Sequence, residues 1–176
     1  MLPVQPVSSP PQDRVVVGDA GSISTFDADC LGVRLLGSEG RELLVVTEDE
    51  EVTLEIRYRV KRDVDDPQVG FKLRNRQGIV LYETNTYCMR KKIGFAGRGS
   101  TIITTFTFLP HIFPDEYTIT VGLGNRGFAE GSFEEILSYL HQTLAFSVVR
   151  PAGSPIWSGL MNLPPAIECR IVPMGD

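Results

Sequence analysis

The segment Val52-Thr-Leu-Glu-Ile-Arg-Tyr-Arg-Val60 decides the fold class of this chain. Apolar side chains occupy every second position of the segment, and polar or charged side chains occupy the positions between them. Successive side chains of a β-strand point to opposite faces of the sheet, so this alternation predicts a strand with one face in a core and one face in water.

The same period of two recurs along most of the chain. Residues 75–78 (Asn-Arg-Gln-Gly) are typical of a turn that joins two such segments into a hairpin. Counting all of them gives eight or nine short strands at hairpin-like spacing, which predicts an antiparallel β-sandwich or barrel. Besides the first segment, the expected strands, some of them weaker, are Cys30–Leu36, Leu43–Val46, Val69–Leu73, Ile79–Thr84, Ile102–Phe108, Tyr117–Leu123, Leu144–Val148 and Ile167–Val172.

One segment predicts a helix. Ser132 is a good N-cap and Glu135 follows three residues later, which is the pattern of a capping box. An apolar stripe at helical spacing accompanies it, formed by Phe133, Ile136, Leu137 and Leu140. The expected fold class is therefore all-β, an antiparallel sandwich with one short helical insertion. Residues 1–20, which contain four prolines, are expected to be a linker that precedes a sandwich domain over residues 21–176.

Composition excludes several classes of protein. The 176 residues are 42% hydrophobic and 22% charged, close to the globular average, which excludes a disordered, collagen-like or coiled-coil chain. The net charge of −5 provides no long-range attraction for nucleic acid, so no nucleic-acid partner is expected. The three cysteines, Cys30, Cys88 and Cys169, lack the spacing of a zinc or redox motif and are expected to be reduced, buried, cytosolic thiols.

Two glycine-rich segments resemble nucleotide-binding motifs. Gly122-Leu-Gly-Asn-Arg-Gly127 spells the dinucleotide pattern, but the expected helix begins too late for its N-terminus to face a pyrophosphate. This segment is interpreted as a loop at the end of a strand. Residues 94–101 lack the lysine of a phosphate loop and, with Arg90, Lys91 and Lys92 upstream, predict a basic surface loop. Neither segment implies a cofactor.

Signs of metal binding or catalysis are few. The cluster Asp63, Asp65 and Asp66 lacks the spacing of a calcium loop and predicts a solvated turn, so no metal is expected. The two histidines, His111 and His141, stand in no catalytic motif. Nothing indicates an enzyme, although two carboxylates that meet only in space would leave no local motif, so a small carbohydrate-active enzyme stays an alternative.

The remaining candidate is a polar surface on the outward rows of the strands. Flat aromatic rings beside fixed hydrogen-bond donors suit sugar rings, which present apolar C–H faces and a ring of hydroxyls. An ordinary solvated face is the simpler interpretation on composition, and a protein-interaction surface for an acidic partner is another. The candidate carbohydrate-binding residues are Arg57, Arg59, Lys72, Arg74, Tyr82, Asn85, Tyr87 and Thr118.

An ordered series of short motifs in residues 29–173 carries a resemblance to a known family. The series is Val52–Tyr58, Pro67–Leu73 with Arg76-Gln-Gly78, Val80–Thr86 with its Thr-Asn-Thr end, Phe108-Leu-Pro110, Pro114–Ile119, and His141 with Phe146-Ser-Val148. The chain resembles the C-terminal carbohydrate-binding domain of the Wzt-type nucleotide-binding subunit of O-antigen ABC exporters. It departs from the family at Asp115, where a glycine is usual, and at Tyr139-Leu140, where the family often has Asp-Trp.

The resemblance implies an immunoglobulin-like sandwich that is not an enzyme. It implies binding of the end of a lipid-linked O-antigen polysaccharide, which is thereby tethered to its exporter at the cytoplasmic face of the inner membrane. The implied partners are the polysaccharide, the ATPase domain and transmembrane subunit of the exporter, and a second copy of the chain. Dimerisation would exchange the strand at about residues 166–172, with Pro151–Pro165 as the crossing arm and the N-terminal linker as the tether to the ATPase domain.

Overall fold

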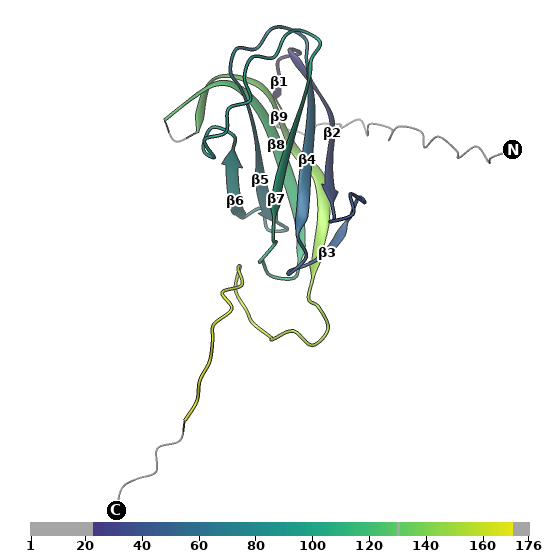
Figure 1. Cartoon of the computed structure of the whole chain (residues 1–176), viewed down its shortest axis with the longest axis vertical. Helices are drawn as coiled ribbons and strands as arrows, with labels where there is room; N and C mark the ends of the chain where they lie inside the picture. Colours follow the sequence, from purple (N-terminus) through teal and green to yellow (C-terminus); the bar gives the residue numbers. More distant parts are fainter. Residues whose placement is uncertain (1–22, 130, 171–176) are drawn as a thin grey trace, which may run out of the picture.

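The computed structural model describes residues 23–129 and 131–170, which form two β-sheets packed face to face (Figure 1). The larger, six-stranded sheet has the order β1-β9-β8-β5-β6, and β3 lies parallel to β9; the smaller sheet has the order β2-β4-β7. No helix occurs in the described residues. The strands are β1 (Ile23–Ser24), β2 (Ala28–Leu36), β3 (Val45–Thr47), β4 (Val52–Val60), β5 (Pro67–Asn75), β6 (Val80–Asn85), β7 (Thr101–Phe108), β8 (Glu116–Phe128) and β9 (Ser132–Val149).

The core lies between the two sheets and is built from the alternating rows. In β4, the central strand of the smaller sheet, Val52, Leu54, Ile56, Tyr58 and Val60 are all buried, while the residues between them are partly or fully exposed. The facing row comes from β5 and β8, where Val69, Ile119 and Val121 are equally buried. The prediction of an all-β sandwich from the period of two is confirmed.

The predicted helix after Ser132 is wrong, because these residues begin β9. Two bulges in the β8–β9 pairing explain the misleading pattern: β9 has one extra residue between Gly124 and Leu123 of β8, and residues 141–143 lie opposite the single residue Thr120. The bulges bring Leu137, Leu140 and Leu144 to the buried side at spacings of three and four, which imitate a helix. Glu135 caps no helix; its carboxylate pairs with Arg62 at 2.6 Å.

Other expectations are also corrected. The Gly122–Gly127 segment is not a loop, because it lies inside β8 and pairs with β9 as far as Phe128. Cys88 and Cys169 are exposed and Cys30 is half-buried, so the expectation of three buried thiols is wrong, although all three are free of disulfides. Residues 1–20, the expected linker, lie outside the described residues.

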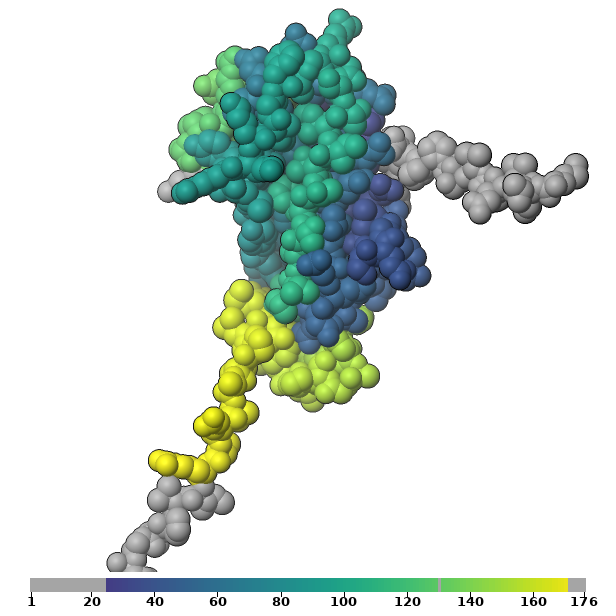
Figure 2. Space-filling model, viewed as in Figure 1, coloured from purple at the N-terminus to yellow at the C-terminus, as the bar shows by residue number. Residues whose placement is uncertain are grey.

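The C-terminal arm, here residues 150–170, leaves the sandwich after two anchoring contacts. The indole Nε1 of Trp157 donates a hydrogen bond to Glu48 at 3.0 Å, and Ile112 pairs with Met161 in an antiparallel bridge. Beyond that bridge the arm extends away from the body of the molecule (Figure 2). Ile167–Arg170 form no strand in this single chain, and residues 171–172 of the predicted exchanged strand lie outside the described residues.

Candidate functional site

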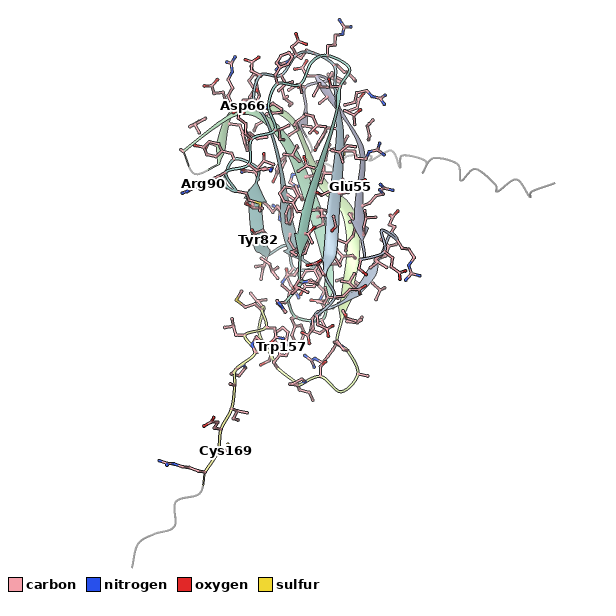
Figure 3. All side chains as sticks on the ribbon, viewed as in Figure 1. Glu55, Asp66, Tyr82, Arg90, Trp157 and Cys169 are labelled. Atoms are coloured by element: carbon pink, nitrogen blue, oxygen red, sulfur yellow. The ribbon has the colours of Figure 1, made fainter. Side chains whose placement is uncertain are left out.

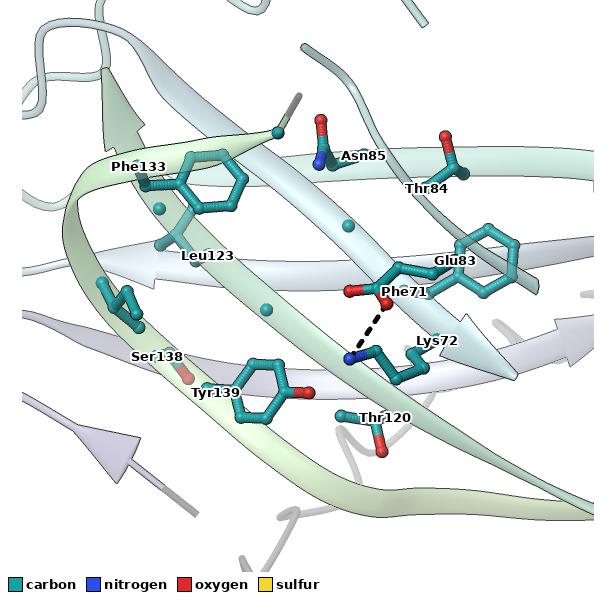
Figure 4. A pocket seen from close by; sticks show the side chains of 15 residues that line it. Phe71, Lys72, Glu83, Thr84, Asn85, Thr120, Leu123, Phe133, Ser138 and Tyr139 are labelled. Atoms are coloured by element: carbon teal, nitrogen blue, oxygen red, sulfur yellow. Dashed lines mark ion pairs between the residues drawn. The ribbon is translucent and has the colours of Figure 1, made fainter. Parts of the chain in front are cut away.

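A glycine-lined groove crosses the outer face of the larger sheet (Figure 4). Gly70 of β5 pairs with Gly122 of β8, and Gly124 follows two residues later. All three line the same shallow cavity, whose volume is about 130 Å³. Because glycine has no Cβ, the floor of this groove is backbone, and larger groups can approach it closely.

Aromatic rings rest on the glycines of β8. A Cβ built on Gly122 would lie 3.4 Å from a ring carbon of Tyr139, and one on Gly124 would lie 2.5 Å from a ring carbon of Phe133. Gly127 has the same relation to Tyr87, whose ring carbon would be 2.7 Å away. Gly124 and Gly127 therefore make room for two rings on the sheet, and Gly122 lies in contact range of a third, which explains the motif without a nucleotide.

A lysine and a glutamate add charge to this groove. The Lys72 Nζ lies 3.0 Å from a carboxylate oxygen of Glu83 and 5.7 Å from the ring centre of Tyr139. Desolvation of its half-buried side chain lowers the pKa of Lys72, but its interactions with Glu83 and Tyr139 outweigh this, so the pKa is raised overall. Lys72 is therefore a fixed cation at neutral pH, held beside an aromatic face.

The structure separates the eight predicted site residues. Lys72 and Asn85 line the groove, and Arg74 and Thr118 pair across β5 and β8 farther along the same outer face. Tyr87 lies at the other end, against Gly127. These five share one side of the molecule.

The other three residues lie elsewhere. Arg57 and Arg59 belong to β4, so they face outward from the smaller sheet, on the opposite side of the sandwich. Tyr82 pairs with buried Leu73, and its ring centre is 5.8 Å from that of Phe71, so it faces the interior side of β6. The expectation that all eight residues form one surface is wrong, because the sequence does not reveal which sheet each strand joins.

Several groove residues were missed from the sequence. Phe133 and Tyr139 lie in the segment whose pattern predicts a helix, and no local signal in the sequence pairs Glu83 with Lys72. The signal was present in the even spacing of Gly122 and Gly124 within a strand, because glycines on the outward row of a central strand indicate close approach of another group.

A second opening lies between the two sheets, where β6 and β7 are the edge strands on the same side. Its volume is about 650 Å³, and its lining is mostly apolar. Tyr82 stands at this opening with Phe71 and Leu73 from the larger sheet, and Phe106 and Phe108 from β7. The smaller sheet has three strands among the described residues, so nothing covers the inner side of β6 there.

Within the described residues, no group of three or more His, Cys, Asp and Glu side chains could hold a metal ion. Neither the groove nor the opening between the sheets contains a metal-ligand set. The described part of the chain has no helix that is long and apolar enough to cross a membrane.

Comparison with known proteins identifies the family. Residues 20–163 match the family model described as the Wzt C-terminal domain. The chain belongs to this family. The crystal structure of the C-terminal domain of Wzt superposes with a TM-score of 0.72 at 15% identity, covering 87% of this chain and 91% of that chain. The Wzt C-terminal domain fold, and the resemblance stated from the motifs, are thus confirmed.

Other comparisons add little. A Niemann-Pick type C2 protein from Japanese carpenter ant reaches a TM-score of 0.49 at 10% identity, covering 76% of this chain and 99% of that chain. No curated protein sequence matches the chain. Membership of the Wzt C-terminal domain family supports a role in an O-antigen exporter, as a non-catalytic C-terminal domain of its ABC subunit.

Proposed function

We propose that the groove of the larger sheet binds the end of a lipid-linked O-antigen polysaccharide and so tethers it to its ABC exporter. The observation that carries this proposal is the row of rings on glycines beside the Lys72–Glu83 pair. Tyr139 and Phe133 offer apolar faces for sugar C–H groups, and the ammonium and carboxylate offer a donor and an acceptor for hydroxyls. A shallow groove buries little ligand surface, so the affinity is expected to be modest.

The test is calorimetric titration of the full chain with O-polysaccharide from the source organism and with an unrelated glycan. Tyr139→Ala is expected to weaken binding of the O-polysaccharide about fivefold, since an aromatic contact of this kind contributes about 1 kcal/mol. Tyr82→Ala is the matched control, because that tyrosine lies on the inner side of β6. Equal binding of both glycans by the folded protein would refute sugar recognition.

The second part of the proposal is a homodimer formed by strand exchange. Leu163 and Ile167 are 74% and 83% exposed on the arm, which is anchored at Trp157 and Met161 and then leaves the body. The edge of β7 has no partner strand among the described residues, and the apolar opening lies beside it. A strand added there from a second copy would extend the smaller sheet and cover the exposed apolar lining.

Solution mass tests this dimer directly. The whole chain is expected to be dimeric, and a chain ending at Pro165 is expected to be monomeric, because it lacks the strand to be exchanged. Ile167→Asp should weaken the dimer, and Glu168→Gln, a change on the same arm, should not. A whole chain that stays monomeric at high concentration would exclude strand exchange.

The proposal places the domain at the cytoplasmic face of the inner membrane. There residues 1–20 would connect it to the ATPase domain, and the transmembrane subunit would receive the polysaccharide. A protein-interaction sandwich is the second candidate, and the position of Arg57 and Arg59 on the face opposite the groove favours it. Binding of an acidic protein that weakens steeply with salt and ignores glycans would support that alternative.

A further inference from the structure

A basic hollow adjoins the end of the groove. Residues Arg90, Lys91 and Lys92 line it together with Tyr87 and Cys88, and its volume is about 730 Å³. Arg90 stands at the side of the molecule that carries β6 (Figure 3). Three consecutive cations in a chain whose net charge is −5 produce a local field of the opposite sign to that of the whole protein.

The turn that carries these cations is held in place by the backbone of β6 and its continuation. Met89 N–H donates to the carbonyl of Asn85 at 3.0 Å, and Lys91 N–H donates to that of Thr86 at 2.8 Å. The Thr86 hydroxyl is buried and donates to Gln68 at 2.6 Å, which fixes the turn to β5. Arg90 has a φ of 56°, a left-handed conformation that costs energy for a residue with a Cβ. The cations thus stand on a defined turn.

The hollow and the groove share a wall. Gly131 lines the groove, and a Cβ on it would lie 2.8 Å from the Cys88 sulfur and 3.0 Å from the Asn85 amide nitrogen. Cys88 in turn lines the hollow, and the ring of Tyr87 rests on Gly127, three residues beyond the groove glycine Gly124. The groove and the hollow are therefore neighbours on the same side of the molecule, and a glycan chain longer than the groove can contact both.

The charges of the hollow are not neutralised by the described part of the chain. Arg90, Lys91 and Lys92 are exposed, and none of them is in an ion pair with a described residue, whereas Arg126 nearby pairs with Asp65 and Glu134. Asp66 is the one carboxylate that lines the hollow among the described residues, and its side chain forms no ion pair there either. Among the residues that the structure describes, the lining of the hollow therefore has an excess of positive charge.

We infer that the basic hollow binds an oxyanion, a carboxylate or phosphate ester carried by the polysaccharide, so that the ligand class of this domain is an acidic glycan. This inference rests on the proposed function of the adjoining groove and adds its charge preference. The guanidinium of Arg90 can hold two oxygens of such a group at once, and Lys92 contributes a point charge. The acidic chain as a whole repels such ligands weakly at long range, and the hollow attracts them where they bind.

Protein-observed NMR titration of the full chain with three monosaccharides tests the inference. Glucuronate and glucose 6-phosphate are expected to shift the backbone amides of residues 87–92, and glucose is expected to leave them unshifted. A preference for one of the two acids identifies which oxyanion is bound, and a preference for either acid supports an oxyanion site in the hollow. Equal shifts with glucose, or no shift with either acid, would overturn it.

Two variants that change the charge of the hollow in opposite directions make the test independent of folding. Arg90→Gln is expected to weaken binding of the preferred acid about two- to fivefold, the usual range for one exposed charge contact. Asp66→Asn should strengthen it about twofold, because a like charge leaves the hollow. Arg41→Gln removes an exposed arginine remote from the hollow and should change nothing. If the hollow contains no oxyanion site, the three variants will bind the acid with the same affinity.

The polysaccharide titration separates this inference from the proposed function. If the chain binds O-polysaccharide through Tyr139 but Arg90→Gln has no effect, the oxyanion site fails and sugar recognition stands. If the acids bind at the hollow but no O-polysaccharide binds, sugar recognition fails and the oxyanion site stands. Binding to vesicles of phosphatidylglycerol with no response to either acid would assign the cations to a membrane surface and overturn the inference.

Discussion

The two outer faces of the sandwich differ in what occupies the outward positions of their strands. On the smaller sheet, two outward pairs from neighbouring strands satisfy each other: the hydroxyls of Thr53 and Thr107 are 2.8 Å apart, and Arg34 pairs with Glu55. On the larger sheet, the outward positions Gly70 and Gly122 have no side chains, and rings from β9 lie over the floor. Polar groups that hydrogen-bond to one another are not available to a ligand. A groove with a glycine floor and aromatic walls, in contrast, has room for one.

The largest expected difference concerns thiol reactivity on the two sides. Burial raises the pKa of Cys30, on β2 of the smaller sheet, from 9.0 to about 11, so its thiolate fraction near pH 8 is about a hundredfold below that of an ordinary thiol. Cys88, beside the groove, is exposed. Iodoacetamide should therefore modify Cys88 rapidly and Cys30 slowly in the folded chain, as peptide mass spectrometry would measure.

Bound polysaccharide is expected to change the reactivity of one exposed thiol and not of the other. It should protect Cys88, which adjoins the groove, and leave Cys169 on the distant arm reactive. Equal protection of the two exposed thiols would mean that the ligand lies elsewhere or that the whole chain has become less accessible to iodoacetamide.

The next effect is on stability and compares two glycines. A Cβ on Gly70 would lie 2.7 Å from the backbone carbonyl oxygen of Thr84, which the sheet holds in place, whereas one on Gly32 of β2 would meet nothing within 4 Å. Gly70→Ala should lower the free energy of unfolding by about 2 kcal/mol, the range of overpacking. Gly32→Ala should leave it unchanged or raise it by about 0.5 kcal/mol, since alanine restricts the unfolded chain. Urea denaturation measures both, and equal losses would show that Gly70 has no special role in the floor.

A smaller effect is expected on glycan affinity. Lys72→Ala should weaken binding of the O-polysaccharide about fivefold, because it removes a donor at the groove and leaves Glu83 without its partner. Arg59→Ala removes a cation from the opposite face and should leave the affinity unchanged. Calorimetry on the two variants would contradict the assignment of the groove if Arg59→Ala weakened binding as much as Lys72→Ala.

The two faces also show what the sequence could predict. The alternation of Val52, Leu54 and Ile56 is a local pattern, so it predicts β4 together with its bounds. Arg57 and Lys72 look alike in sequence, and only the pairing of β4 with β7 and of β5 with β8 puts them on opposite sides. The rings were missed for a different reason: Phe133 and Tyr139 lie on a strand whose bulges break the period of two, and their meeting with Gly124 and Gly122 depends on the register of two strands.

The smallest effect tests whether the smaller sheet is as self-sufficient as its contacts indicate. A cross-strand hydroxyl pair on an exposed face contributes about 0.5 kcal/mol, so a double-mutant cycle of Thr53→Val and Thr107→Val should give a coupling energy of that size. The same cycle on Lys72→Met and Glu83→Gln should give a larger coupling, since the lysine is half-buried and carries a full charge opposite a carboxylate. The groove pair, unlike the threonines, should lose coupling when saturating polysaccharide is present, because the ligand hydroxyls would take over part of its hydrogen bonding. If the polysaccharide weakened the threonine coupling instead, the ligand would contact the smaller sheet. The glycan-binding face would then be the outer face of the smaller sheet and not that of the larger one.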